Sequence, residues 1–302
     1  MTFEDLDASV IAVPPLARRD DYSLNTEANR ALVHYLETGG VSTILYGGNA
    51  NFYNIGLNEY AAILQSLTEI AAKDSWMIPA VGPSYGMFMD QAEVLTDFDF
   101  PTAMVLPMST AATPAGVETG LRRFAERFGK PIIIYLKFEG YLTAEGVRRL
   151  VDDGLVCAVK YAVVREDPLI DDYLRELCDT VDRRYLISGI GERPAIVHLR
   201  DFGLSSFTSG SVCVAPRQST QLLRALKRQD YEEATSLRGR FLPLEDLRDS
   251  INPIRVLHDA VSLADIADMG PILPLSSNLD ETDRDRVAAA ATDLAERERA
   301  VA

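Results

Sequence analysis

The chain has 302 residues, of which 47% are hydrophobic and 25% are charged, as is typical of a globular protein with a large apolar core. Its formal net charge of −15 argues against nucleic acid or an anionic membrane surface as the main partner. The three cysteines form no CxxC pair or His/Cys cluster, and the acidic N-terminus has no signal-peptide pattern. We therefore expect a cytoplasmic protein with no metal site and no membrane span.

Eight short apolar runs of β-type alternate with segments of helical periodicity. In chain order, the runs are Val10–Val13, Thr43–Tyr46, Met77–Val81, Ala103–Leu106, Ile132–Tyr135, Cys157–Lys160, Tyr185–Ile187 and Ser206–Thr208. Their ends recur at the length of a βα unit, and their apolar character throughout indicates a parallel sheet covered on both faces. We therefore predict an α/β fold, a (β/α)₈ TIM barrel, with an open doubly wound sheet as the alternative.

Helical periodicity marks further segments, and after Pro216 the strand signal stops. We expect helices at Leu57–Ala72, Thr119–Phe128, Pro168–Asp179, Gln218–Arg228, Tyr231–Phe241, Pro253–Ser262 and Glu281–Glu298. The many charges of the last helix are expected to face solvent. The predicted organisation is a barrel over residues 1–215 and a C-terminal helical extension over residues 216–302, packed on the barrel as one structural unit.

Lys160 is the most unusual residue of this pattern, because it lies in the apolar run Cys157–Val163. Burial disfavours the charged form of an amine and lowers its pKa, and a neutral amine in a dry pocket is a nucleophile for carbonyl groups. The alternative is a strand-end lysine that extends to water. The active site of such a barrel lies at the C-terminal ends of its strands. Lys160 would then lie beside Tyr135, which ends the preceding strand and is able to transfer protons.

Two glycine-containing loops follow strands at the same end of the predicted barrel. The loop Gly47–Asn51 can expose backbone N–H groups that suit a carboxylate, although a simple turn explains its glycines equally well. The loop Ser188–Arg193 contains a Gly-x-Gly sequence that falls far short of a dinucleotide-binding motif.

Several segments together resemble the dihydrodipicolinate synthase / N-acetylneuraminate lyase superfamily. The segments that match its motifs in order and spacing are Val13–Leu16, Gly47–Phe52, Tyr135, Ala158–Lys160, Ser209–Pro216 and Asn252–Ile254. The resemblance implies that Lys160 forms a Schiff base with pyruvate or another 2-keto acid, and that Tyr135 is the proton shuttle. It further implies that Gly48 and Asn49 bind the carboxylate of the keto acid. No cofactor is expected, and a homo-oligomer, either a tetramer or a dimer, is implied.

The departures from the family pattern are informative as well. Asn49 stands in place of a threonine, and Pro107–Ser109 stands where the synthases have a pair of tyrosines. The segment Leu136–Gly140 lacks the arginine that would bind an amino-dicarboxylate, so a true dihydrodipicolinate synthase is not expected. Lys137, two positions after Tyr135, instead resembles the sugar-acid branch, such as 5-dehydro-4-deoxyglucarate dehydratase.

The resulting hypothesis is a class I lyase that acts on a 2-keto acid, as a dehydratase or an aldolase of a deoxy sugar acid or a pyruvate-derived substrate. Lys137, Glu192, Arg193 and Gly210 are predicted as further substrate-binding residues, and for the three charged ones a solvent-exposed loop position is the alternative. A second hypothesis is a barrel that binds a keto acid or sugar acid as a sensor without turnover, because two motifs are altered. The presence of both a nucleophile and a proton shuttle argues against it, since binding alone needs neither.

Overall fold

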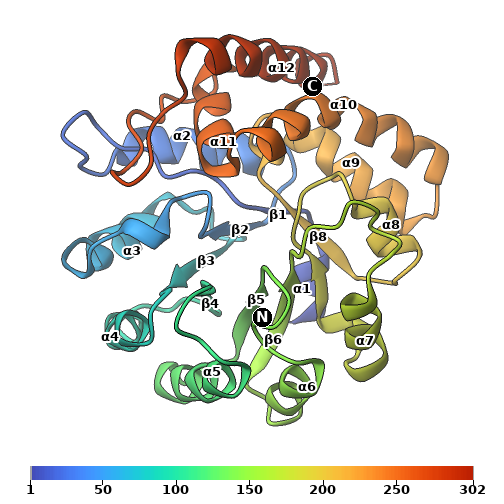
Figure 1. Ribbon diagram of the computed structural model, residues 1–302. Coiled ribbons are helices and arrows are strands. Elements are labelled where there is room, and N and C mark those ends of the chain that lie inside the picture. Colours follow the sequence, from blue (N-terminus) through green and yellow to red (C-terminus); the bar gives the residue numbers. More distant parts are fainter. Residues whose placement is uncertain (1, 302) are drawn as a thin grey trace.

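A closed barrel of eight parallel strands in sequential order forms the centre of the computed structural model, which describes residues 2–301 (Figure 1). The strands are β1 (Ile11–Ala12), β2 (Thr43–Tyr46), β3 (Trp76–Val81), β4 (Met104–Val105), β5 (Ile132–Leu136), β6 (Val156–Tyr161), β7 (Leu186–Ser188) and β8 (Ser206–Ser209). The barrel closes where Ile11 and Ala12 of β1 pair with β8. The predicted (β/α)₈ barrel is confirmed, and each of the eight apolar runs overlaps a strand.

Helices surround the barrel, one after each strand (Figure 1). The ring consists of α2 (Thr26–Thr38), α3 (Leu57–Ile70), α4 (Tyr85–Leu95), α5 (Pro114–Phe128), α6 (Ala144–Asp152), α7 (Asp172–Thr180), α8 (Ala195–Arg200) and α9 (Pro216–Lys227). Outside the ring are α1 (Phe3–Asp7), α10 (Tyr231–Ser250), α11 (Pro253–Leu263) and α12 (Glu281–Arg299), and the short 3₁₀ turns are η1 (Phe52–Asn54), η2 (Arg183–Tyr185) and η3 (Ser211–Cys213). In residues 2–301 no helix is long and apolar enough to span a bilayer.

The helix boundaries differ from the predicted ones where capping residues decide them. Helix α5 begins at Pro114 because the side chain of Thr113 accepts a hydrogen bond from a backbone N–H of the first turn. Helix α7 begins only after Asp171, which caps it in the same way. Helix α10 runs through Pro243 to Ser250, well beyond the predicted end at Phe241.

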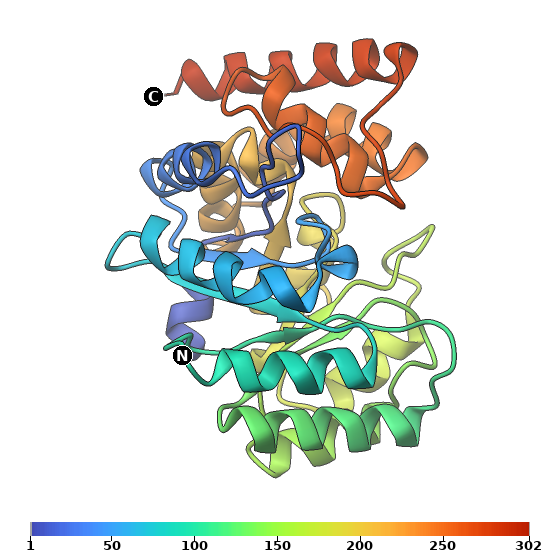
Figure 2. The ribbon, with the colours of Figure 1, turned by 90° about the vertical axis from the view of Figure 1, so that its left-hand side faces the viewer.

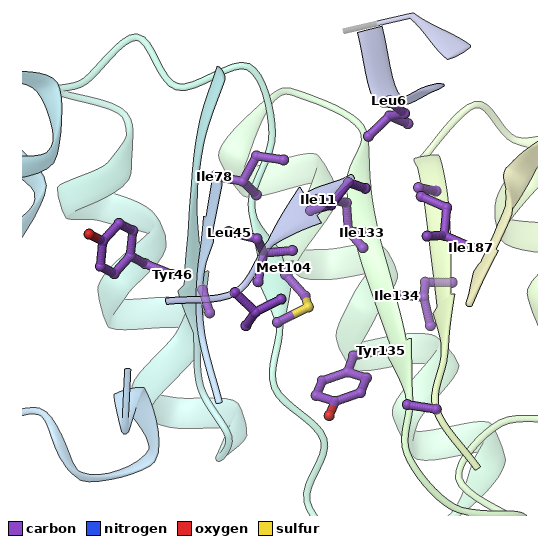
Figure 3. Close-up of a cluster of buried hydrophobic side chains, with 14 of the residues drawn as sticks. Leu6, Ile11, Leu45, Tyr46, Ile78, Met104, Ile133, Ile134, Tyr135 and Ile187 are labelled. Atoms are coloured by element: carbon purple, nitrogen blue, oxygen red, sulfur yellow. The ribbon is translucent and has the colours of Figure 1, made fainter. Parts of the chain in front are cut away.

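Apolar side chains fill the inside of the barrel and also the space between strands and helices. Figure 3 shows Leu45 directed into the interior cluster and Tyr46, the next residue of β2, on the opposite side of the strand. Both are fully buried, as is every residue of β2, which explains why this strand does not alternate between apolar and polar residues. Leu6 of α1 lies at one end of this cluster and Tyr135 at the other, with its hydroxyl directed away from the core (Figure 3). The apolar packing thus extends through the barrel up to the open end where the strands terminate.

The C-terminal helices form an added layer on one side of the barrel (Figure 2). A second apolar cluster, which includes Phe241 and Leu294, joins α10, α11 and α12. The layer begins with α10, because α9 follows β8 and completes the ring; the division of the chain after residue 215 stays a prediction. Not all charges of α12 face solvent as expected: Glu298 is buried, and its carboxylate accepts hydrogen bonds from the backbone N–H groups of Arg217 and Gln218. It thereby caps the N-terminus of α9.

Candidate active site

A pocket of about 140 Å³ opens at the C-terminal ends of the strands. Its lining comes from the loop after β2, from the ends of β5 to β8, and from the outer helices α10 and α11. Of the predicted site residues, six line this pocket: Gly48, Asn49, Tyr135, Lys137, Lys160 and Gly210. The barrel therefore brings together residues that are far apart in the chain, such as Gly48 and Gly210, which are separated by more than 160 positions.

Lys160 lies on β6, directly opposite Tyr135 of β5 in the strand register. Its side chain is buried, with Nζ 4.6 Å from the centre of the Tyr135 ring. Burial lowers the pKa of Lys160 to about 7, and the positive charge of Lys137 contributes in the same direction. A substantial share of this amine is therefore neutral near pH 7, as a nucleophile requires. The alternative of a lysine that extends to water is wrong.

Gly189, just after β7, leaves the space that the side chain of Lys160 occupies. A Cβ at this position would lie 2.9 Å from Cγ of Lys160 and 2.7 Å from the carbonyl oxygen of Tyr161. Both contacts are too close for carbon, so a larger residue would displace the lysine or the strand. The Gly-x-Gly sequence of this loop thus has a packing role beside the lysine.

Tyr135 and Lys137 project from the same strand end at different depths. Tyr135 is buried, and burial raises its pKa to about 12, although the positive charge of Arg248 opposes the rise. Lys137 stands at the exposed rim with Nζ 5.5 Å from the centre of the Tyr53 ring, and partial burial lowers its pKa. Within residues 2–301 no carboxylate forms an ion pair with Lys137. Its ammonium is therefore available to an anionic ligand.

The loop after β2 presents backbone donors to the pocket. Within residues 2–301, neither Gly48 nor Asn49 uses its backbone N–H in a hydrogen bond. The side chain of Asn49 is held by the carbonyl oxygen of Val13 at 2.9 Å, which fixes the loop against β1. Gly210 permits this arrangement, because a Cβ there would lie 2.6 Å from Nδ2 of Asn49. The altered residue Asn49 thus has a structural task, and its main chain is free to bind an anion.

Glu192 and Arg193 do not line the pocket, which corrects the expectation that they contact substrate. Glu192 turns inward after Gly191 and is fully buried, where its carboxyl group accepts hydrogen bonds from Ser209 at 2.8 Å and Ser219 at 2.6 Å. Arg193 points outward and pairs with two aspartates of α10. Both side chains are instead held by packing between the loop after β7 and α10. This packing could not be predicted from the sequence.

The buried pair of Glu192 and Glu245 is the most perturbed acidic group near the pocket. The backbone N–H of Glu192 donates to Glu245 at 3.1 Å, and Arg248 donates to the same carboxylate oxygen at 2.8 Å. Burial raises the pKa of Glu192 to about 8, and the negative charge of Glu245 adds to the effect. Burial raises the pKa of Glu245 too, opposed by Arg248. Burial and mutual repulsion therefore favour a proton on this carboxyl pair at neutral pH.

This raised pKa predicts a loss of stability with rising pH. Between the ordinary pKa of 4.5 and about 8, the folded protein binds more protons at Glu192 than the unfolded chain does, so the free energy of unfolding falls as pH rises. One proton contributes a slope of at most roughly 1.4 kcal/mol per pH unit. We expect Glu192→Gln to make the decline between pH 5 and pH 8 shallower in urea unfolding at a series of pH values. An identical slope in both proteins would contradict the assignment.

Sequence reasoning missed the part of the pocket wall that α10 and α11 supply. Arg248 and Asp249 near the end of α10, and Pro253, Ile254 and Leu257 of α11, all line the pocket. The predicted helix ended at Phe241, so residues 242–250 were not assigned to any helix. The Asn252-Pro253 pair was a usable signal, because asparagine followed by proline is typical of a helix start and therefore of a bend after α10.

No protein-family model matches the chain. It is similar to the probable 5-dehydro-4-deoxyglucarate dehydratase 2 of Streptomyces coelicolor, with 26% identity over 254 residues that cover 82% of this chain and 77% of the relative. The similarity thus includes most of the barrel.

Solved structures share the whole fold. Dihydrodipicolinate synthase from Bacillus clausii has a TM-score of 0.84 at 20% identity and covers 95% of this chain and 97% of its own. A prophage protein of the dihydrodipicolinic acid synthase family from E. coli K12, solved in complex with pyruvate, has a TM-score of 0.83 at 19% identity, with 95% and 98% covered. The similarity confirms the barrel together with its outer C-terminal helices.

Proposed function

Because the chain is a divergent member of the dihydrodipicolinate synthase / N-acetylneuraminate lyase superfamily and a lyase, we propose that it forms a Schiff base between Lys160 and a 2-keto acid. We propose further that it dehydrates a deoxy sugar acid. The observation that carries the proposal is the buried Lys160 amine, with a pKa lowered to about 7, against the ring of Tyr135.

The geometry supports each binding step of this chemistry. The free N–H groups of Gly48 and Asn49 suit the carboxylate beside the keto group, in a chain whose overall negative charge gives an anion no help. The Lys160 amine then adds to the keto carbon, and loss of one water leaves the imine. Lys137 at the rim is the cation available for a further anionic group of the substrate.

Dehydration requires removal of a proton from the carbon next to the imine and departure of the hydroxyl group on the following carbon. The protonated imine accepts the electron pair of the C–H bond, and the hydroxyl leaves with a proton as water. Tyr135 lies beside Lys160, which supports its assignment as the group that passes these protons. The name of the S. coelicolor relative, and Lys137 at the position that resembles its branch, favour dehydration over aldol cleavage.

The proposal is tested by borohydride reduction in the presence of pyruvate, followed by intact mass and peptide mapping. We expect one reduced pyruvyl adduct per chain, on Lys160. A panel of 2-keto-3-deoxy sugar acids, including 5-dehydro-4-deoxyglucarate, is then assayed for loss of the substrate and for free pyruvate. Free pyruvate as a product would show that the reaction is aldol cleavage and not dehydration. No adduct with pyruvate or with longer 2-keto acids would favour the sensor hypothesis.

A further inference from the structure

One wall of the pocket is built outside the barrel, by the end of α10. This helix ends at Ser250, and Asn252 starts α11 by accepting hydrogen bonds from the backbone N–H groups of Ile254 and Arg255. The bend places Arg248 and Asp249 at the pocket, where they face the ends of the barrel strands. Neither residue is needed for the Schiff-base step described above, so their presence in the wall calls for another role.

The guanidinium group of Arg248 is held rigidly. The side chain is 95% buried, since its exposed fraction is 5%. Its Nη1 donates to the carbonyl oxygen of Ile190 and to Glu245, both at 2.8 Å, and its Nε donates to Asp249 at 2.9 Å. The remaining nitrogen, Nη2, is buried and makes no hydrogen bond within residues 2–301, although it lies 2.8 Å from the same Asp249 oxygen. This buried donor lies against the Asp249 carboxylate, so the guanidinium group fixes that carboxylate in the pocket wall.

Asp249 supplies an acceptor beside this donor. Its carboxylate is oriented from both sides, by Arg248 on Oδ1 and by Arg193 at 3.0 Å on Oδ2. A carboxylate offers about four acceptor positions, so two arginine contacts leave others free. Its side chain is partly open to solvent, in keeping with a place on the pocket surface. Donor and acceptor therefore lie side by side and in fixed positions.

The charges around this pair decide which ligand group fits. The two positive charges of Arg193 and Arg248 face three carboxylates, those of Asp246, Asp249 and Glu245. The cluster has no excess positive charge, so it is poorly suited to a further carboxylate. A hydroxyl group donates a hydrogen bond to the Asp249 carboxylate without bringing charge.

We propose that Asp249, held in position by Arg248, recognises a hydroxyl group on the carbon chain of the substrate, beyond its keto carbon, and so selects hydroxylated 2-keto acids over simple ones. This inference rests on the proposed function and names the determinant of its substrate class. A site built to bind a hydroxyl group rejects analogues that lack it, because its polar groups are then left without partners.

The test compares two probes in the borohydride reaction: pyruvate, which has no chain hydroxyl, and 2-keto-3-deoxygluconate, which has several. For Asp249→Ala we expect the half-saturating concentration of 2-keto-3-deoxygluconate to rise about tenfold or more, and that of pyruvate to stay within about twofold. The matched control is Asp246→Ala, which also removes a partner of Arg193 but lies outside the pocket lining. It should change neither value.

Two results would overturn the inference: no change for either probe, or an equal rise for both, which indicates general damage to the pocket. If the wild-type protein forms no adduct with either probe, the Schiff-base proposal fails, and calorimetric titration with 2-keto-3-deoxygluconate tests the recognition by itself. Weaker binding to Asp249→Ala than to Asp246→Ala supports the inference, and equal binding refutes it. The two proposals therefore fail by different results.

Discussion

Replacing Lys160 by alanine is expected to abolish the pyruvate adduct and to lower turnover by roughly 10⁴-fold or more, because it removes the buried amine whose pKa is lowered to about 7. In the wild-type protein the rate of adduct formation should rise with pH, with a midpoint near 7, because the pKa of Lys160 is lowered to about 7 and only the neutral amine reacts. The rate is measured by mass spectrometry at short reaction times over a pH series.

Lys137 provides the control for this pH dependence. Its positive charge is the second cause of the lowered pKa of Lys160, after burial. Lys137→Gln should therefore retain the adduct and move the midpoint to higher pH. An adduct that maps to Lys137, or one that persists in Lys160→Ala, would contradict the assignment of the nucleophile.

Replacing Tyr135 by phenylalanine is expected to lower kcat for the sugar-acid substrate by roughly 10² to 10⁴-fold, the range typical of a lost proton-transfer group. The substitution removes only the hydroxyl group and keeps the ring against which Nζ of Lys160 lies at 4.6 Å. Packing, and the low pKa of Lys160 that depends on burial, should thus persist. Turnover is measured with the substrate identified in the sugar-acid panel.

Adduct formation with pyruvate and the Tm of this variant show whether a lower kcat comes from lost proton transfer or from a damaged structure. We expect Tyr135→Phe to form the adduct and to unfold within a few degrees of the wild-type protein. Turnover at the wild-type rate would show that another group carries the protons. Loss of both the adduct and the thermal transition would show that the hydroxyl group is needed for folding.

The barrel could be predicted from the sequence because its strands are buried on both faces, so that most are apolar runs without alternation that end where polar loop residues begin. The pocket residues that follow directly from this regularity, Lys160, Tyr135 and the loop after β2, were found for the same reason. Their relative depth in the pocket, with Lys137 at the rim and Tyr135 buried, was not visible.

The sequence was least informative where the function of a charged side chain depends on tertiary contacts. Glu192 has the polarity of a loop residue at a pocket, but two serines and Glu245 hold it in the interior. Arg248 was missed because the predicted helix Tyr231–Phe241 stops short of it, whereas α10 continues to Ser250. In each case the partners lie far away along the chain, and no local pattern reports them.

The contact between Glu298 and the start of α9 has a consequence for how the protein is made. The carboxylate is translated 80 residues after Gln218, whose backbone N–H it accepts. At about 5–20 residues per second, a ribosome needs roughly 4–16 s to supply it. During this interval all eight strands have already been synthesised, while the helix that completes the ring lacks its final stabilising partner. The cap of α9, next to the β8–β1 seam where the barrel closes, thus becomes available only after α10 and α11 have been translated.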